Sequence, residues 1–437
     1  MKTFAQGINV EHKKQSTEHR NIEEASIPAR VVIPLLQHTG AICEPLVKVG
    51  DEVVEGQKIG DCSKLISAPV HASISGKVTK IAKFPYPCGA DEMAVVIEGN
   101  GNTEHRTQSA ELRDIVTAVR EAGIVGLGGA AFPTHVKLSP PKDKKIDTLV
   151  VNGCECEPYI TADHRIMLER ADAVIQGARL AAKAVNAARI IIGVEDNKRD
   201  AVKALRAVIR QQHIQEAPDG VEVISLETKY PQGGEKMLIK TLLDREVPSG
   251  ELPFDIGVMV INVGTAVAIA EAVECGQPLI KRVMTVTGSG VKEPKNLLVR
   301  IGTTFQDIID QCGGLTEDAA KVIMGGPMMG LALATLDLPV VKATSCLLVL
   351  NRKETQVFQE KACIRCGRCI GVCPAGLMPN FLADYAKLQD WDSAGANHVA
   401  DCIECGCCAY ICPSRIFLTQ YFKAAKLALH LRRSSCR

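Results

Sequence analysis

The 437-residue sequence predicts a multidomain α/β protein, and three patterns along the chain support this fold class. Short β-branched runs separated by Gly and Pro fill residues 31–100, which indicates a small all-β domain. Strand-like and helix-like segments alternate over residues 110–275, which indicates a parallel sheet covered by helices. Two cysteine runs lie in an otherwise helical tail, residues 354–437. A chain of this length is too long for one hydrophobic core.

The overall charge is nearly balanced, with 51 basic and 50 acidic residues and a net charge of +1. No bulk field favours nucleic acid, so nucleic acid is not expected as a partner. The chain opens on polar and charged residues, and we expect no secretory leader. The longest apolar run, Ile256 to Val273, contains Asn262 and Glu271 and is predicted to be a strand followed by a helix. It is too short and too polar for a membrane span.

Residues 1–30 are polar and are expected to form an arm rather than a packed element. After them, Val47 to Gly60 and Ser67 to Val78 resemble the two quasi-repeated halves of a lipoyl or biotinyl carrier sandwich. Such a carrier presents a modifiable lysine on a hairpin tip, whereas the corresponding turn here is Ala68-Pro69-Val70-His71-Ala72. Residues 31–100 are therefore predicted to be a structural docking module with a barrel-sandwich fold.

Residues 110–275 form the largest predicted domain. A helical pattern up to Ala122 leads into a Gly-rich segment, and alternating elements follow. Strands are expected at 147–152, 189–194 and 221–225, and helices at 171–186 and 199–212. Ligands in open α/β sheets bind beyond the carboxyl ends of the strands, so the strand-to-helix junctions are candidate sites. Residues 281–345 then return to short β runs around one helix, Phe305–Cys312.

The Gly-rich segment contains Gly126, Gly128 and Gly129 and fits G-x-G-x-x-A, which alone is a weak dinucleotide signal. A helix precedes these glycines, whereas the dinucleotide fingerprint requires a strand. The glycines nevertheless offer backbone amides that a phosphate can approach, with Lys137 nearby as a cation. A plain tight turn is the alternative interpretation.

Three further junctions carry polar side chains. Asn152 is followed by two carboxylates at i, i+2, Glu155 and Glu157, which can accept hydrogen bonds from ribose hydroxyls or flavin N–H groups. A second Gly-rich turn runs from Tyr230 to Lys236, and Asn262-Val263-Gly264-Thr265 follows an apolar strand. Because the carboxyl ends of parallel strands share one edge of a sheet, these junctions are expected to converge.

Each cysteine run has the spacing C-x2-C-x2-C-x3-C-P, by which bacterial ferredoxins hold paired [4Fe–4S] clusters. Three thiolates of one run bind one cluster, and the fourth binds the other cluster. The predicted ligand sets are Cys363, Cys366, Cys369 and Cys412 for one cluster, and Cys402, Cys405, Cys408 and Cys373 for the second. Zinc is the alternative, but it needs only four ligands. The long spacer between the runs favours an all-α two-cluster module.

At these residues the chain resembles a known family. The segments "GLGGAAFPTHVK", "LVVNGCECEPY", "YPQGGEK" and "NVGTA" are similar to the FMN- and NADH-binding segments of the complex I flavoprotein subunit. With the N-terminal sandwich and the "CIRCGRCIGVCP…CIECGCCAYICP" tail, their order resembles the RnfC family, the NADH-facing subunits of Rnf ion-translocating ferredoxin:NAD oxidoreductases. The resemblance covers almost the whole chain and implies a Rossmann-like FMN/NADH domain. It also implies a β-grasp domain of the SLBB type at 281–345.

The resemblance also implies the cofactor contacts. FMN contacts carry over to Gly126, Gly128, Gly129, Lys137, Asn152, Tyr230, Gly233, Gly234, Asn262 and Thr265. NADH contacts carry over to Phe132, Glu157 and Glu235, and Glu155 is a further candidate in the same site. Two departures stand out: Gln6 occupies a position where the family more often has Gly, and Cys154 and Cys156 bracket Glu155. No general acid or base is required, so no catalytic residue is predicted.

The three kinds of cofactor can form one electron-transfer chain. NADH delivers two electrons together as a hydride, whereas an iron–sulfur cluster takes one, and a flavin can convert between the two. We therefore predict electron transfer between NAD(H) and two [4Fe–4S] clusters by way of FMN. Expected partners are the membrane-embedded Rnf subunits and the ferredoxin-like Rnf subunit, with ion translocation in the membrane subunits. Since cluster thiols must stay reduced, we expect a reducing, cytoplasmic compartment. The resemblance to Rnf complexes further implies a peripheral position on the cytoplasmic face of the membrane.

Two alternatives remain at this point. A soluble relative, such as a cobalamin reductase or the electron donor of a proline reductase, would share the cofactors and differ in its partner. A non-enzymatic iron–sulfur scaffold would lack the flavin. The direction of electron flow, the choice between Na+ and H+, and the roles of Cys154, Cys156 and Cys407 cannot be derived from the sequence.

Overall fold

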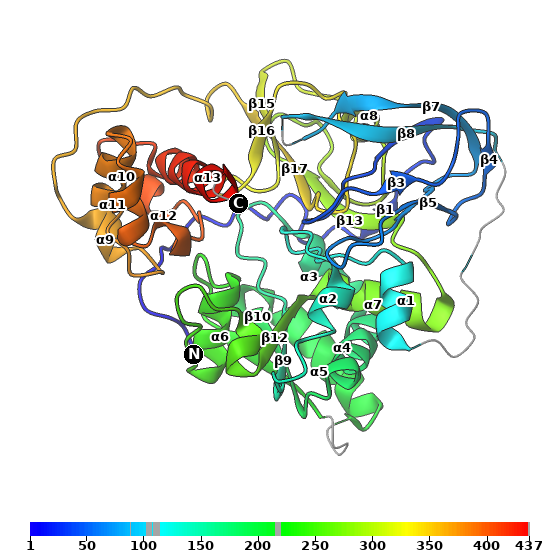
Figure 1. Cartoon of the computed structure of the whole chain (residues 1–437), viewed down its shortest axis with the longest axis horizontal. Coiled ribbons are helices and arrows are strands. Elements are labelled where there is room, and N and C mark those ends of the chain that lie inside the picture. Colours follow the sequence, from blue (N-terminus) through cyan, green and yellow to red (C-terminus); the bar gives the residue numbers. More distant parts are fainter. Residues whose placement is uncertain (88, 102–106, 108–113, 215–219, 436–437) are drawn as a thin grey trace.

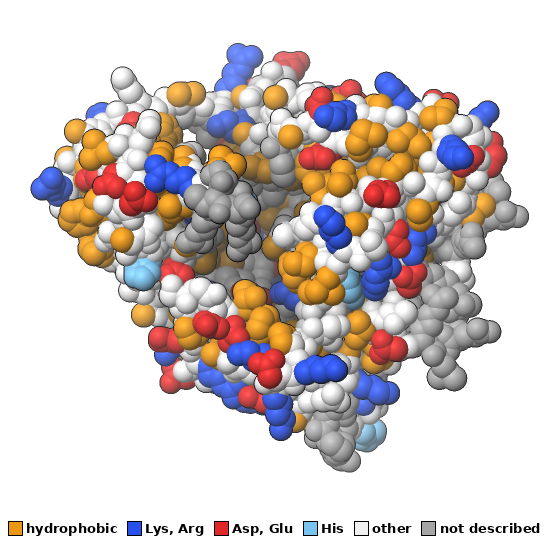
Figure 2. Space-filling view, in the orientation of Figure 1, with side chains coloured by type: hydrophobic (Ala, Val, Ile, Leu, Met, Phe, Trp, Pro, Cys, Tyr) orange, Lys and Arg blue, Asp and Glu red, His pale blue; other side chains and the backbone are white. Residues whose placement is uncertain are grey.

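The computed structural model describes residues 1–87, 89–101, 107, 114–214 and 220–435. The main hydrophobic clusters lie in a β sandwich, a parallel α/β layer, a second mixed sheet and a helical tail, in chain order. Figure 1 places the helical tail at one end, beside the α/β layer and the mixed sheet and away from the sandwich. Figure 2 shows the same face, hollowed between the tail and the rest of the molecule.

The N-terminal domain is built from two small sheets. One has the strand order β2-β8-β7-β4 and the other β3-β5-β6. The strands are β2 (Arg30–Pro34), β3 (Glu44–Pro45), β4 (Glu52–Val53), β5 (Lys58–Asp61), β6 (Val70–His71), β7 (Gly76–Pro85) and β8 (Asp91–Gly99). Inward β-branched residues such as Val31, Ile59 and Ile97 fill the core between them. The predicted barrel-sandwich fold is confirmed.

The first 30 residues differ from the expected arm. Phe4, Ile8 and Val10 are buried, and β1 (Ile22–Glu24) pairs in parallel with β14 (Lys295–Arg300). The prediction of an unpacked arm is wrong because β14 presents an edge whose backbone groups need partners. Gln6 has a φ of 59°, in the left-handed region that favours glycine.

A four-stranded parallel sheet forms the centre of the α/β domain, in the order β11-β10-β9-β12. Its strands are β9 (Thr148–Asn152), β10 (Arg189–Glu195), β11 (Val221–Leu226) and β12 (Val258–Asn262). β9, β10 and β12 are largely apolar and buried, as expected for a sheet covered on both faces, whereas the edge strand β11 carries the exposed Glu222. All the strands and helices predicted here from alternation are present within two residues of the expected bounds.

Helices cover both faces of this sheet. One face carries α3 (Ala162–Glu169), α4 (Ala171–Val185), α5 (Arg199–Gln211) and α7 (Val263–Cys275), and α6 (Glu235–Leu243) packs on the other. Helices α4 and α7 lie so close that a Cβ on Gly177 would be 1.7 Å from the Ala266 carbonyl oxygen. Two short helices, α1 (Ile115–Glu121) and α2 (Thr134–Lys137), flank the Gly-rich segment. The part of its preceding helical pattern before residue 114 lies outside the described residues.

The third domain is a six-stranded mixed sheet, β1-β14-β13-β17-β15-β16, with α8 (Phe305–Gln311) packed on it. Its other strands are β13 (Lys281–Thr287), β15 (Ala319–Met324), β16 (Leu331–Leu333) and β17 (Cys346–Asn351). β17 lies beyond the expected domain end at 345, yet it pairs with both β13 and β15. The sheet therefore continues to Asn351.

The tail is helical apart from the two cysteine loops. Its helices are α9 (Arg368–Gly371), α10 (Pro379–Lys387), α11 (Trp391–Ala396), α12 (Cys407–Tyr410) and α13 (Leu418–Ser435). The spacer between the cysteine runs forms α10 and α11, which confirms the predicted all-α module. Among the described residues, no helix is both long and apolar enough to cross a membrane.

Candidate cofactor sites

The strand order creates a switch point in the central sheet. From β9 the chain moves outward to β10 and β11, and then returns to place β12 on the other side of β9. Asn152 and Asn262, the last residues of β9 and β12, are paired neighbours in register. Crevices beyond the carboxyl ends of strands at such a reversal are where open α/β sheets bind ligands. Two of the predicted junctions therefore meet where a ligand is expected.

The Gly-rich segment closes over this edge. The Gly126 amide donates to the Phe132 carbonyl at 2.9 Å, and the Leu127 amide donates to Thr265 Oγ1 at 2.9 Å. A Cβ on Gly128 would lie 3.3 Å from Asn262 Cβ, so the loop lies directly on the end of β12. Gly129 has a φ of +125° and no heavy atom within 4 Å of where its Cβ would be. Its backbone is therefore open to a ligand from that side.

Helix N-termini add to the electrostatics of this edge. Asn262 caps α7 by accepting from the Gly264 amide at 2.8 Å, and Gly234 is the N-cap of α6. The Asn152 side chain donates to the Gly233 carbonyl at 2.8 Å, which ties the second Gly-rich turn to the end of β9. The positive dipole ends of these two helices favour an anionic group such as a phosphate.

Lys137 provides a cation between these elements. Its Nζ donates to Glu235 Oε1 at 3.0 Å and to the Val260 carbonyl at 3.1 Å. The two charged side chains are 34% and 40% exposed, so both remain accessible. The pair therefore joins α2, β12 and the first turn of α6 at the rim of the site.

The two predicted carboxylates have their oxygens engaged within the protein. Glu157 accepts from the Met328 and Met329 amides at 3.2 and 2.8 Å, and burial raises its pKa to about 7. Glu155 accepts from the Asp163 and His164 amides at the start of α3, and burial raises its pKa to about 7 while the charge of Lys14 opposes that rise. Their roles in cofactor binding stay predictions.

Several polar residues beneath the site escaped the sequence analysis. Lys14 Nζ donates to the Glu155 carbonyl at 2.8 Å and to the Ile160 carbonyl. Lys198 Nζ donates to the Cys154 carbonyl at 2.6 Å and pairs with Glu195 at 3.1 Å, both side chains being 1% exposed. The position of Glu195 at the carboxyl end of β10 was the available signal. The sequence contained no signal of the Lys14 contacts, because they join residues far apart in the chain.

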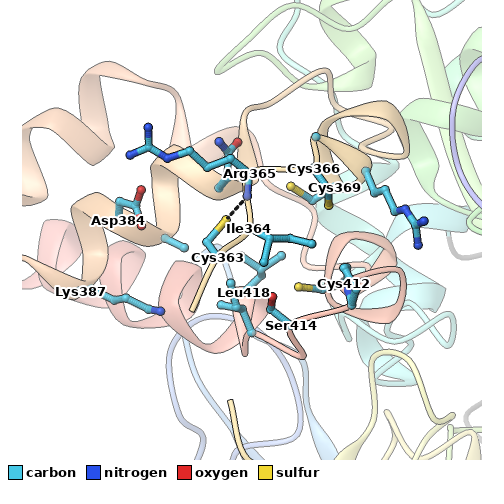
Figure 3. Close-up of a pocket in the computed structure, with 16 residues that line it drawn as sticks. Cys363, Ile364, Arg365, Cys366, Cys369, Asp384, Lys387, Cys412, Ser414 and Leu418 are labelled. Carbon is cyan, nitrogen blue, oxygen red and sulfur yellow. Dashed lines mark hydrogen bonds between the residues drawn. The ribbon is translucent and has the colours of Figure 1, made fainter. Parts of the chain in front are cut away.

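The thiols of the first predicted ligand set surround one cavity. Cys363 and Cys366 lie on the first cysteine loop, Cys369 follows in α9, and Cys412 reaches the same cavity from the second run, as Figure 3 shows. The Arg365 amide donates to Cys363 Sγ at 3.4 Å. Cys363 and Cys366 are exposed, so this outer cavity lies at the surface.

The second ligand set lines an inner cavity. Cys402 and Cys405 come from the second loop, Cys408 from α12 directly after it and Cys373 from the first run, and all but Cys402 are buried. The Tyr230 hydroxyl donates to the Cys405 carbonyl at 2.8 Å. Cys407 is also buried, and its thiol donates to the Tyr230 carbonyl at 3.9 Å. The inner cavity therefore adjoins the second Gly-rich turn of the α/β domain.

The donor sets fit the implied cofactors. Four thiols, three from one loop and one from the other run, are the ligand pattern of a [4Fe–4S] cluster. At the switch point, the open backbone of Gly129 with the helix N-termini and Lys137 suits a phosphate-bearing flavin.

Four family models match the chain in the order of its domains. The RnfC barrel sandwich hybrid domain matches residues 2–102, and the Nuo51 FMN-binding domain matches residues 119–271. The SLBB domain matches residues 283–332, and the 4Fe-4S dicluster domain matches residues 355–413.

Whole-chain relatives are also similar. The C subunit of the proton-translocating ferredoxin:NAD(+) oxidoreductase complex of Clostridium ljungdahlii is 47% identical, covering 88% of this chain and 84% of the relative. The C subunit of the Na(+)-translocating complex of Acetobacterium woodii is 46% identical over 91% and 90%. The C subunit of the ion-translocating oxidoreductase complex of Klebsiella pneumoniae is 42% identical over 97% of this chain and 56% of its own length.

A solved structure shares the fold at lower identity. A chain of the NAD+-reducing [NiFe]-hydrogenase in its H2-reduced state superposes with a TM-score of 0.52 at 20% identity. The match covers 74% of this chain and 62% of that chain.

Proposed function

The chain belongs to the family formed by the C subunits of ion-translocating ferredoxin:NAD(+) oxidoreductase complexes, and from this premise we propose how its sites work. It is an oxidoreductase subunit that carries electrons between NAD(H) and ferredoxin-linked carriers through FMN and two [4Fe–4S] clusters. Its partners are the other subunits of the complex and NAD(H).

One observation carries this proposal: the inner cysteine loop packs directly on the second Gly-rich turn of the switch point. A Cβ on Gly234 would be 3.7 Å from Ile403 Cδ1, and Tyr230 bonds to the backbone of Cys405. A cofactor site and a cluster site are thus in contact within one chain. The contact between the inner cysteine loop and the second Gly-rich turn therefore favours electron transfer between two sites over a scaffold that holds clusters without a flavin.

The chain's own residues hold the cofactors in place. Backbone amides of the Gly-rich loop and the start of α7 hold the FMN phosphate, with Lys137 as a neutralising charge. In this proposal the ring of Phe132 and the carboxylates of Glu157 and Glu235 contact NADH, as the resemblance to the family implies. When bound, FMN supplies the exchange between paired and single electrons, chemistry that belongs to the cofactor. The predicted thiolates fix both clusters, and the inner one lies nearer to the switch point.

Ion translocation belongs to other subunits of the complex. The two relatives of highest identity described above carry names with different ions, one proton-translocating and one Na(+)-translocating, although each covers most of this chain. Features that this chain shares with both relatives therefore do not determine which ion is translocated. We place the chain at the cytoplasmic face of the membrane as a peripheral subunit, because its cluster thiols require a reducing compartment.

Anaerobic reconstitution with iron, sulfide and FMN tests the cofactor content. We expect one FMN and about eight irons per chain, and bleaching of the flavin absorption by NADH. Lys137→Met is expected to weaken FMN binding about ten-fold, because it removes a charge beside the phosphate. Lys144→Met, which removes a surface ion pair with Asp255, is the matched control and is expected to bind FMN normally. A wild-type protein that retains no FMN would contradict the proposal.

A further inference from the structure

The two cysteine loops have the same backbone conformation. Arg365 and Glu404 occupy equivalent positions with φ values of 53° and 58°, and Gly367 and Gly406 follow at 74° and 81°. The Glu404 amide donates to Cys402 Sγ at 3.4 Å, as the Arg365 amide does to Cys363 Sγ. The sequences C-I-R-C-G-R-C and C-I-E-C-G-C-C therefore align position by position.

The inner loop is covered by the rest of the protein. Ile403 lies against Gly234, and Cys407 is buried against the Tyr230 carbonyl. A Cβ on Gly406 would lie 3.2 Å from the Met328 carbonyl oxygen. The tip of this loop is thus the surface by which a cluster module docks on its redox neighbour.

The same tip of the outer loop is exposed. Ile364, the counterpart of Ile403, is 68% exposed, and Arg365 and Arg368 are exposed where the inner loop has Glu404 and Cys407. Figure 3 shows Ile364 and Arg365 beside the outer thiols.

The charge around this tip is predominantly positive. From residue 361 to residue 383 the chain contains Lys361, Arg365 and Arg368 and no Asp or Glu. Exposed Arg415 adds a further positive charge and stacks on Phe358. Of the nearby acids, Asp384 lines the same cavity and Glu360 pairs with Lys387. The tip therefore presents the apolar Ile364 together with two exposed guanidinium groups, Arg365 and Arg368, and Asp384 is the acid of the same cavity.

We propose that the outer loop tip is the docking surface for a partner protein whose one-electron centre lies in an acidic face. The proposal rests on the proposed function, since it identifies the chemistry of the partner at the outer cluster. Complementary charge speeds encounter and selects the partner, and the exposed Ile364 supplies the apolar contact that Ile403 makes at the inner loop. In the complex, one electron passes: one centre is oxidised as the other is reduced, without bond formation or proton transfer.

The test is the binding of reconstituted holoprotein to an oxidised acidic [2Fe–2S] ferredoxin, measured by calorimetry. Between ionic strengths of about 0.01 and 0.15 M the Debye length falls from about 30 to 8 Å, and we expect affinity to fall about ten-fold. The Arg365→Glu/Arg368→Glu variant is expected to bind ferredoxin about ten-fold more weakly than the wild type at low salt. Its affinity is also expected to depend much less on salt. The doubly substituted Arg365→Lys and Arg368→Lys protein keeps the charge and is expected to restore binding.

Lys203→Glu with Arg210→Glu on α5 is the matched control, because it makes the same change in charge on exposed residues of the α/β domain. Iron content and flavin bleaching by NADH are measured in every variant, and their absence in the wild type would count against the proposed function instead. If the Arg365→Glu/Arg368→Glu variant binds the ferredoxin as tightly as the wild type does, the docking proposal is wrong. Equally tight binding of a basic cytochrome c, or arginine-dependent adsorption to phosphatidylglycerol vesicles without ferredoxin binding, would also overturn it.

Discussion

The Tyr230 hydroxyl donates a hydrogen bond to the Cys405 carbonyl oxygen at 2.8 Å, which joins the α/β domain to the inner cysteine loop. Tyr230 is 1% exposed, and burial raises its pKa far above its ordinary value, so the hydroxyl stays protonated and remains a donor. This bond fixes the inner loop against the switch point.

Tyr230→Phe keeps the ring and removes this donor. We expect the free energy of unfolding to fall by about 1 kcal/mol, with an unpaired carbonyl left at Cys405. We also expect slower electron exchange between flavin and clusters, measured by stopped-flow absorbance. Tyr385→Phe in α10 is the control. If both substitutions leave the exchange rate unchanged, the contact has no role in coupling the two sites.

The buried Lys14 is expected to be a major contributor to stability. Its ammonium group and the Glu155 carboxylate lie 3.7 Å apart and are each 4% exposed. Lys14→Met leaves two buried carbonyl oxygens and the carboxylate without their cation, and is expected to cost about 3 kcal/mol in chemical unfolding. Lys13→Met removes an ion pair of a side chain that is 39% exposed, and is expected to cost less than about 1 kcal/mol.

A double-mutant cycle checks the interpretation of Lys14. The double variant Lys14→Met/Glu155→Gln is expected to lose less free energy of unfolding than the two single variants lose together. Each single substitution leaves the other side chain buried without its partner. Additive costs would show that Lys14 acts through packing alone.

Acid is expected to loosen the interface between the sandwich and the α/β domain, where His71 of β6 lies so close to Gly123 that a Cβ on that glycine would be 3.3 Å from His71 Cε1. Burial, and then the charge of Lys342, lower the pKa of His71 to about 3. The folded pKa is below the unfolded value of 6.5, so this stabilisation is complete above 6.5 and is lost as the pH falls towards 3. Between neutral pH and pH 5 the loss is about 2 kcal/mol.

Hydrogen exchange measures this effect. Between pH 7 and pH 5, corrected for intrinsic rates, we expect protection of β5, β6 and β7 to fall in the wild type and to change less in His71→Gln. The same loss of protection in both proteins would place the acid sensitivity elsewhere.

The exchanged fourth ligand of each cluster has a direct test. Cys412→Ser is expected to lose the cluster that Cys363→Ser loses, and Cys373→Ser the cluster that Cys402→Ser loses, each leaving about four irons. Cys407→Ser is expected to keep about eight irons, since its thiol bonds to the Tyr230 carbonyl. Mössbauer spectra identify the retained cluster. Identical spectra for Cys412→Ser and Cys402→Ser would reverse the assignment.

Local patterns made much of this protein predictable. The cysteine spacing grouped Cys412 with Cys363, and both residues line one cavity. The grouping was predictable because the spacing within each run is visible in the sequence. The alternation of strands and helices placed the junctions at Asn152 and Asn262 on one sheet edge for a similar reason. Periodicity and spacing are properties of neighbouring residues, and the sequence displays them directly.

Long-range pairing was not predictable. The polar segment around Lys14 contacts residues more than 140 positions away, so nothing near it in the sequence signals burial. Likewise, nothing near Met328 and Met329 in the sequence indicates that their loop binds Glu157 and touches the inner cysteine loop. The unexpected place of β17 in the sheet has the same origin, because its partners β13 and β15 are set by the tertiary fold.

The most direct test of electron conversion within one chain is the reoxidation of reduced clusters by NAD+. Reconstituted protein is reduced with dithionite, desalted anaerobically, mixed with NAD+ and frozen at intervals for EPR. We expect both cluster signals to decay while one NADH forms for every two electrons lost, and the outer cluster to stay reduced in Cys408→Ser. Cluster signals that persist in the wild type after NAD+ is added, with no NADH formed, would contradict the account.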